Sequence, residues 1–359
     1  MKILLLGDLS SLSNNLKDGL QQFGHDVTIA SSGGGWRKTH SDLSLNSRFF
    51  KSSTLLGKIE KHFLNFKYAL LKYRDFDVVQ LLNPFFFPVY FGYNEKLISR
   101  IIKQNDKTFL TSAGCDSFVY KSFQKSDYSP CNSCKVLDLK SKKCRYEKNI
   151  YQKSNNKIAD MVNGIIPVLY EYTEAYRNHP KYIKTIPLPI NTDKNEFMEN
   201  IVVNKKLIIF HGINRIGFKG TEIIKEALSK IKEKYPNDVD IIIDGKMPLA
   251  KYLNIMKKTN IIIDQCYSYS YGMNALYGMA LGKVVLSGNK KSHYKDTNII
   301  ENPIINIKPS VSDIYKKLLM LVENKSLVAE IGYRSRKFVE YFHNYKKIAS
   351  DYIDVWNHF

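Results

Sequence analysis

Short apolar runs alternate with segments of helical periodicity along both halves of the chain. In the first half, a helix is predicted over 14–23, and buried-type strands are predicted at 3–6, 27–30, 78–82, 108–111 and 164–166. Strands that alternate with helices form a parallel sheet covered by helices on both faces. The pattern therefore predicts an α/β protein with a doubly wound, Rossmann-like sheet.

The second half repeats this scheme. Strands are predicted at 207–210, 240–243, 260–264, 284–286 and 304–307. Helices are predicted at 220–234, 248–258, 272–281, 311–324 and 326–354, with Ser310 and Ser326 as N-caps of the last two. Prolines in the stretch 187–191 favour an extended linker there. We expect domains at 1–188 and 189–337, facing a cleft at the carboxyl ends of their strands, with the helix 338–359 packing back on the first domain.

Amino-acid composition indicates the class of protein and its expected location. The 359 residues are 44% hydrophobic and 25% charged, as in a globular protein. No apolar run reaches the roughly 18 residues of a membrane span, and the apolar start 3–6 is followed at once by Gly7 and Asp8. We therefore expect a cytoplasmic protein.

The net charge of +20 favours anionic partners, including anionic lipid and phosphorylated substrates. An AT-rich genome that encodes lysine freely explains the same excess. The lysines are spread along the chain without a basic tail, which speaks against nucleic acid as a partner.

The segment 211–220, HGINRIGFKG, lies between a predicted strand and a predicted helix. Its glycines let the backbone approach a ligand, and Arg215 and Lys219 bring two cations to one turn. A guanidinium fork and an ammonium group suit a diphosphate. An ordinary loop with two solvated cations is the alternative.

A second segment strengthens the diphosphate interpretation. The predicted strand 260–264 ends in the polar pair Asp264 and Gln265, and a helix opens at Gly272 after a short loop. The free N–H groups at a helix start form an anion site that needs no charged side chain. A tightly packed helix without a ligand would explain the glycines but not the polar strand end.

The order of these motifs resembles the family-4 retaining glycosyltransferases of the GT-B fold, most closely a bacterial branch that builds surface polysaccharides. The likeness covers nearly the whole chain and is strongest from 207 to 288, through Arg-x3-Lys-Gly, Asp-Gln, Tyr-Gly-Met and Gly-Met-Ala-Leu-Gly-Lys. It implies sugar transfer with retention from a nucleoside-diphosphate sugar to a glycan or polyprenyl-linked acceptor.

The resemblance also assigns residues. Arg215 and Lys219 would contact the donor diphosphate, the 271–274 amides would contact phosphate or sugar, and the strand end at Gly245 would lie near the base. The donor-binding candidates are Gly212, Arg215, Lys219, Gly245, Gln265, Tyr271, Gly272, Met273, Asn274 and Tyr277.

The sequence departs from the family at its carboxylates. Many members carry two glutamates eight positions apart, where this chain has Tyr269 and Tyr277. Many also carry a histidine where Ala113 stands, and Asp116 is the candidate substitute. Asp116 and Asp264 are therefore the predicted catalytic residues. The two Asp-x-Asp strings precede strands, so no metal is expected in catalysis.

Four cysteines, Cys115, Cys131, Cys134 and Cys144, are spaced as zinc ligands can be. A structural zinc or a set of unrelated reduced thiols both fit this pattern. Cys266 is predicted to be a small buried residue.

The stretch 54–74 has apolar residues at helical spacing with lysines among them. Such a helix could rest on anionic lipid, making the protein peripheral on the inner face of the membrane, or it could pack on the sheet with its lysines in solvent.

Two further functions are compatible with the sequence. One is a sugar-nucleotide epimerase, and the other is a non-catalytic protein that binds nucleotide-sugar and organises an assembly, which the two tyrosines in place of glutamates make worth testing.

Overall fold

The chain folds into two compact units. This structure is a computed structural model that describes residues 1–33, 38–47, 49–50, 54–134, 144–213, 217–296, 299 and 301–359. The N-terminal unit comprises Met1–Ser122, Asp138–Pro187 and Lys346–Phe359, and the C-terminal unit comprises Phe123–Leu137 and Leu188–Tyr345.

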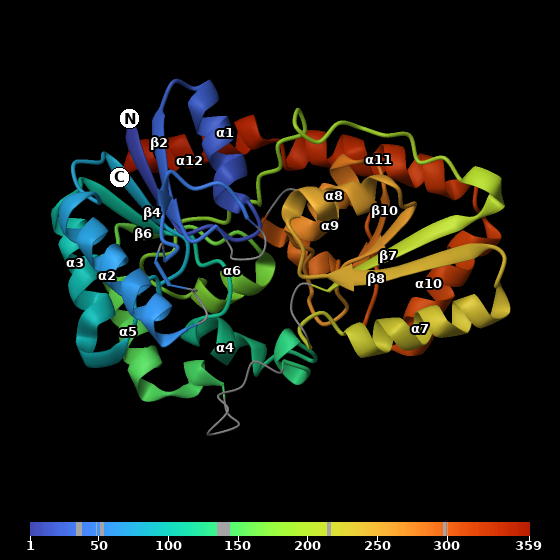
Figure 1. Cartoon of the computed structure of the whole chain (residues 1–359), viewed down its shortest axis with the longest axis horizontal. Coiled ribbons are helices and arrows are strands. Elements are labelled where there is room, and N and C mark those ends of the chain that lie inside the picture. The colour runs from blue at the N-terminus through green and yellow to red at the C-terminus, as the bar shows by residue number, and fades with distance from the viewer. Residues whose placement is uncertain are drawn as a thin grey trace. The chain divides into compact units, whose positions relative to one another are not determined.

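The N-terminal unit is built on a parallel sheet of six described strands in the order β3-β2-β1-β4-β5-β6 (Figure 1). The strands are β1 (Lys2–Leu6), β2 (Asp26–Ser31), β3 (Leu43–Ser44), β4 (Val78–Leu81), β5 (Lys107–Leu110) and β6 (Gly164–Ile165). The helices are α1 (Leu12–Gln22), α2 (Leu55–Leu71), α3 (Tyr93–Lys103), α4 (Ser117–Phe123), α5 (Asn149–Met161), α6 (Tyr170–Tyr176) and α12 (Tyr345–His358).

The C-terminal unit has a second parallel sheet, in the order β11-β10-β9-β7-β8. Its strands are β7 (Leu207–Ile213), β8 (Val239–Gly245), β9 (Ile261–Ile263), β10 (Val284–Ser287) and β11 (Ile305–Asn306). Its helices are α7 (Thr221–Lys234), α8 (Leu249–Lys257), α9 (Met273–Ala280), α10 (Val311–Glu323) and α11 (Leu327–Phe342). Two parallel-sheet α/β units confirm the predicted fold class.

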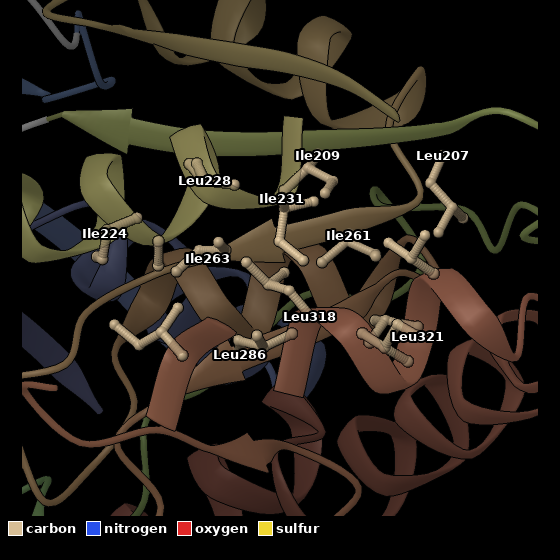
Figure 2. Close-up of a cluster of buried hydrophobic side chains, with 14 of the residues drawn as sticks. Leu207, Ile209, Ile224, Leu228, Ile231, Ile261, Ile263, Leu286, Leu318 and Leu321 are labelled. Carbon is tan, nitrogen blue, oxygen red and sulfur yellow. The ribbon is translucent and has the colours of Figure 1, made fainter. Parts of the chain in front are cut away.

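One face of the C-terminal sheet packs against α7 and α10. Figure 2 shows the aliphatic side chains of this core, among them Ile209 and Ile261 from the sheet, Leu228 from α7 and Leu318 from α10. All four are at most 1% exposed. Strands buried on both faces explain the continuous apolar runs in the sequence. Cys266 belongs to the same core, which confirms its prediction as a small buried residue.

The predicted helix 326–354 is wrong as a single element, because it divides into α11 and α12. At the break, His343 donates through Nδ1 to the carbonyl of Leu188 over 2.8 Å, and its own carbonyl accepts the N–H of Ile190 over 2.8 Å. These bonds to the linker replace helical ones. Ser310 and Ser326 are the N-cap residues of α10 and α11, as predicted. The Ser310 hydroxyl accepts the Asp313 N–H over 3.4 Å, whereas the Ser326 side chain makes no capping hydrogen bond.

Helix α12 completes the core of the N-terminal unit. Its side chains Ile348, Tyr352 and Trp356 are buried with residues of β1 and α1. The Trp356 indole donates to Gln80 Oε1 over 3.1 Å, and its carbonyl accepts from Lys107 Nζ over 2.8 Å. The last residues of the chain therefore stabilise its first strands.

We predict that Trp356→Ala destabilises the N-terminal unit by about 3–5 kcal/mol, because it opens a cavity and removes the partner of a buried Gln80 oxygen. Trp356→Phe fills most of the cavity and should lose less. Calorimetric unfolding would measure both variants, and a Trp356→Ala protein as stable as wild type would contradict this packing.

Candidate functional site

The order of strands in the C-terminal sheet defines where a ligand can bind. From β7 the chain continues to β8 on one side, while β9 lies on the other. Ligands of doubly wound sheets bind at such a switch point, outside the carboxyl ends of the strands. The segments that leave β7 and β9 at this point are those that contain Lys219 and Asp264, which sequence analysis had selected.

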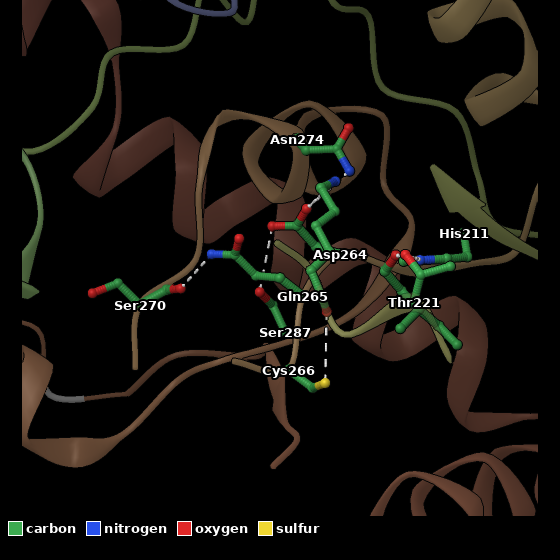
Figure 3. A network of polar contacts seen from close by, with 10 residues as sticks. His211, Thr221, Asp264, Gln265, Cys266, Ser270, Asn274 and Ser287 are labelled. Carbon is green, nitrogen blue, oxygen red and sulfur yellow. Dashed lines mark hydrogen bonds and ion pairs between the residues drawn. The ribbon is translucent and has the colours of Figure 1, made fainter. Parts of the chain in front are cut away.

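Lys219 and Asp264 form a buried ion pair. Lys219 Nζ lies 2.8 Å from Asp264 Oδ1, and the two residues are only 7% and 2% exposed. Asn274 donates to the same oxygen over 3.0 Å, and Ser287 donates to Oδ2 over 3.4 Å. Figure 3 shows Asp264 between Asn274 and Ser287. The carboxylate thus joins the β7 loop, the end of β9 and the start of α9.

The electrostatics of the pair are dominated by its burial. Burial alone would raise the pKa of Asp264, but the Lys219 charge and the hydrogen bonds from Lys219, Asn274 and the Gly272 N–H outweigh it and lower the pKa. Asp264 is therefore ionised at neutral pH. Removal of one partner from such a buried pair typically costs about 3–5 kcal/mol, because the other charge is left uncompensated.

Helix α9 begins beside this pair. Gly272 is its N-cap, and a Cβ atom added at Gly272 would meet no atom within 4 Å, so the helix start faces open space. The first N–H groups of a helix lack intrahelical acceptors and carry its positive dipole end. The Lys219–Asp264 ion pair and the start of α9 therefore lie together, and the helix amides beyond the Gly272 N–H, which Asp264 accepts, are the ones that an anion could meet.

Two predicted glycines are explained by neighbouring protein atoms. A Cβ atom at Gly212 would lie 1.7 Å from the Tyr252 hydroxyl oxygen, and one at Gly245 would lie 1.8 Å from the Ile213 carbonyl oxygen. Both positions require glycine for packing within the unit, whatever ligand binds there.

The remaining donor-binding candidates differ in their surroundings. Tyr271 is fully buried, and its hydroxyl donates to His343 Nε2 over 2.9 Å. Gln265 donates to the Ser270 carbonyl over 3.0 Å. Met273 and Tyr277 are buried in α9. Arg215 lies outside the described residues.

In the N-terminal unit, the predicted catalytic residue Asp116 is fully buried. Its carboxylate accepts the Val119 N–H over 2.8 Å at the start of α4 and the Tyr176 hydroxyl over 2.8 Å. Burial raises its pKa to about 6. These contacts give Asp116 a helix-capping role, and its catalytic role stays a prediction.

Sequence analysis missed Asp8, which follows β1 at the switch point of the first sheet. Its carboxylate accepts the N–H groups of Ser13 over 2.9 Å and Ser11 over 3.2 Å. Burial raises its pKa, although the side chain is not fully enclosed. The sequence contained a signal for this residue, because Asp8 comes two residues after a predicted strand, at the carboxyl-terminal edge of the sheet that Asp116 also follows.

A second missed cluster lies at Tyr269, one of the two tyrosines at which the sequence departs from the family that it resembles. Lys290 Nζ lies 3.7 Å from the centre of the Tyr269 ring and 3.1 Å from Asp127 Oδ2. The Tyr269 hydroxyl donates to the same carboxylate over 3.2 Å, and Tyr128 packs edge-on against the ring. A cation and an aromatic face therefore stand where a carboxylate was expected. No local pattern predicts this contact, because Asp127 and Tyr269 are far apart in the sequence.

His211 connects β7 to the start of α7. Its Nδ1 lies 2.8 Å from the Ile263 carbonyl oxygen, which can only accept, so Nδ1 carries the proton. Nε2 therefore accepts from the Thr221 hydroxyl, 3.0 Å away. Burial, followed by the nearby Lys219 charge, lowers the pKa of His211 to about 4. His211 is thus neutral and structural at physiological pH.

The four cysteines of the predicted zinc site are divided between the units. Cys115 and Cys144 belong to the N-terminal unit, and Cys131 and Cys134 belong to the C-terminal unit. Within either part of the chain that the structure describes, no three metal-binding side chains come together. Zinc stays a prediction.

Comparison with solved structures identifies the fold. The chain matches sucrose-phosphate synthase from Thermosynechococcus elongatus with a TM-score of 0.66 and 14% identity, over 100% of this chain and 98% of that one. It matches HepE from Anabaena in complex with UDP-glucose with a TM-score of 0.62 and 12% identity, over 100% of both chains. The two parallel-sheet units therefore have the GT-B fold of glycosyltransferases.

A different activity occurs on the same architecture. The chain also matches a protein described as a putative UDP-N-acetylglucosamine 2-epimerase from Listeria monocytogenes, with a TM-score of 0.56 and 12% identity, over 98% of this chain and 94% of that one. No protein-family model and no curated protein match the sequence.

We predict that His211 makes the C-terminal unit less stable in acid. Its pKa is lowered from 6.5 to about 4 on folding, so between these values the unfolded chain binds a proton that the folded chain does not. Stability from this residue is lost as the pH falls, by about 2 kcal/mol between neutral pH and about pH 5. Hydrogen exchange of the β7 amides at the two pH values would measure this change. The non-titrating variant His211→Asn should lack it, and equal pH dependence in both proteins would contradict the assignment.

The zinc prediction has a direct check. Metal analysis of the purified protein should find about one zinc per chain if the four cysteines bind it, as closed thiolate sites do. Replacing Cys131 and Cys134 by serine should then remove the metal. A zinc content near zero in the wild-type protein would eliminate the site.

Proposed function

We propose that the protein transfers a sugar, with retention of configuration, from a nucleoside-diphosphate sugar to a glycan or polyprenyl-linked acceptor in surface polysaccharide synthesis. The observation that carries this proposal is the buried Lys219 beside the open start of α9, at the switch point of the C-terminal sheet. The GT-B fold supports it, because similar structures include a protein bound to UDP-glucose.

The donor diphosphate is proposed to lie at the start of α9. Lys219 would supply one charge-assisted hydrogen bond, Arg215 a second, and the amides of residues 271–274 would add the helix dipole. As the sugar leaves, negative charge grows on the diphosphate, and donors that are already fixed in place stabilise that charge without reorganising.

Asp264 is proposed to act through Lys219. It holds Nζ in place over 2.8 Å, which makes it a positioning residue. The predicted roles of Gln265, Gly245 and Tyr277 near the sugar or the base belong to the same proposal. Asp116 remains the candidate in the N-terminal unit, with Asp8 beside the same sheet edge.

A sugar-nucleotide epimerase is the second candidate, favoured by the structural likeness to the Listeria protein. Both activities require the protein to bind a nucleoside diphosphate, but only sugar transfer requires an acceptor. The fates of the sugar and of the nucleotide therefore distinguish them.

We predict that a nucleoside diphosphate binds the wild-type protein, and that Arg215→Ala and Lys219→Ala each weaken this binding at least about tenfold, the loss expected for a charge-assisted hydrogen bond. Calorimetric titration with UDP, GDP and ADP would measure the affinities. Unchanged affinity in both variants would show that the diphosphate assignment is wrong.

A matched control is available in the same unit. Lys325 pairs with Asp238 at the amino-terminal side of β8, the edge of the sheet opposite the candidate site. Lys325→Ala should leave nucleotide affinity unchanged. Because Lys219→Ala also strands a buried carboxylate, thermal unfolding of each variant must show that it is folded at the assay temperature.

The activity itself is tested with individual nucleotide-sugars and a membrane extract. Release of nucleoside diphosphate that depends on the extract, with a product of unchanged anomeric configuration, is the expected result. An epimerised sugar without acceptor would identify the second candidate. Nucleotide binding without turnover of any donor would indicate a non-catalytic protein.

A further inference from the structure

Helix α2 exposes its apolar side. Leu55, Leu56, Ile59 and Phe63 are 53–74% exposed, and on a helical projection they fall within an arc of about 100°. The buried positions of the helix are instead Gly57, Asn65 and Ala69, with Asn65 accepting a hydrogen bond from the Tyr73 hydroxyl over 3.2 Å. Further along the same arc, Phe66 and Leu70 are half-buried, and Phe66 stacks on Tyr93, so the exposed apolar surface is confined to the first half of the helix.

The apolar surface continues beyond the helix. Glu60 is the one acid of α2, and its carboxylate accepts the N–H groups of Phe49 and Phe50, each over 3.2 Å. These bonds hold the two phenylalanines, which are 86% and 47% exposed, beside α2. We call the exposed side chains of Phe49, Phe50, Leu55, Leu56, Ile59 and Phe63 the α2 patch.

Cations border the α2 patch. Lys58 and Lys67 are exposed and lie on opposite sides of the apolar arc, and Lys72 follows the end of the helix. An apolar stripe between lysines matches a helix that lies in the interface of an anionic membrane, where apolar side chains enter the acyl boundary and ammonium groups meet the headgroups. None of the described helices is long and apolar enough to cross a membrane.

We propose that the α2 patch docks the protein on an anionic lipid surface. The charges favour lipid over a second copy of this chain, because a two-fold contact through α2 would bring the lysines of both copies together. The inference deepens the proposed function, since it states where the enzyme would meet a lipid-linked acceptor. Vesicle binding involves no sugar transfer, so its failure would leave the proposed activity untouched.

The test is co-sedimentation of the full chain with phosphatidylcholine vesicles that contain or lack about one third phosphatidylglycerol. We expect binding to the anionic vesicles that weakens with added salt. Ile59→Glu and Phe63→Glu should each reduce the affinity at least about tenfold, because a carboxylate would enter the acyl boundary. Lys58→Ala combined with Lys67→Ala should reduce the affinity about 25-fold, at about fivefold for each lysine.

Ile201→Glu is the matched control. Ile201 is 60% exposed, close to the 54% of Ile59, but it belongs to the C-terminal unit, so this variant should bind vesicles as the wild type does. Because all the substituted side chains are exposed, circular dichroism should show unchanged folding. The proposal is overturned if the wild type does not bind anionic vesicles, or if Ile59→Glu binds them equally well. It is also overturned if the wild type is a dimer and Ile59→Glu is a monomer, because the α2 patch would then bind a second copy of this chain.

Discussion

The buried ion pair between Lys219 and Asp264 is the interaction on which the candidate site depends. Neither charge is stable alone at 7% and 2% exposure, so each holds the other in place. Through Asn274 and the Gly272 N–H, the same carboxylate sets where α9 begins. The loops after β7 and β9 are joined further by the Cys266 N–H, which donates to the Lys219 carbonyl over 3.0 Å. An anion arriving at the start of α9 would meet donors that are already oriented.

The charges around Tyr269 bear on how this unit could attract an anion. The Asp264 charge is matched by Lys219, so Lys290 contributes the further positive charge among the described residues around Tyr269. Asp127 neutralises Lys290 in part, but it is exposed and its ion pair is screened by solvent. A multiply charged diphosphate is attracted by such a surplus. Tyr269 offers its ring to Lys290 and its hydroxyl to Asp127, which fixes the cation without adding a second negative charge.

Much of the fold could be predicted because strands buried on both faces are apolar throughout. Ile3–Leu6 and Ile261–Ile263 lie within predicted strands, and Ser310 caps α10 as its position suggested. The break between α11 and α12 could not be predicted, since His343 is fixed there by Leu188 and Ile190, which are distant in sequence.

The site residues show the same difference between local sequence patterns, which can be recognised, and long-range contacts, which cannot. Lys219 could be chosen because it lies in a glycine-rich segment between a predicted strand and a predicted helix, and Asp264 because it ends a predicted strand. The contact of Asp127 with Tyr269 could not, because it depends on tertiary folding. Tyr271 resembled a ligand residue by its motif, yet its hydroxyl is satisfied by His343.

Helix α2 shows why apolar periodicity alone does not determine which side of a helix is buried. Its sequence fits both a helix packed on a sheet and a helix resting on lipid, because both need one apolar side. The residues on the other side of the helix decide which side is buried. In α2 these include Gly57 and Ala69, which are small, and Asn65, which accepts a hydrogen bond from the Tyr73 hydroxyl. A small-residue face allows close approach to the N-terminal unit, and the large apolar side chains are then left in solvent. Leaving Leu55, Ile59 and Phe63 there forgoes part of the about 1.5–3 kcal/mol that complete burial of such a side chain contributes. An exposed contiguous apolar surface of this kind marks an interaction site, and its flanking lysines indicate the sign of the charge on its partner.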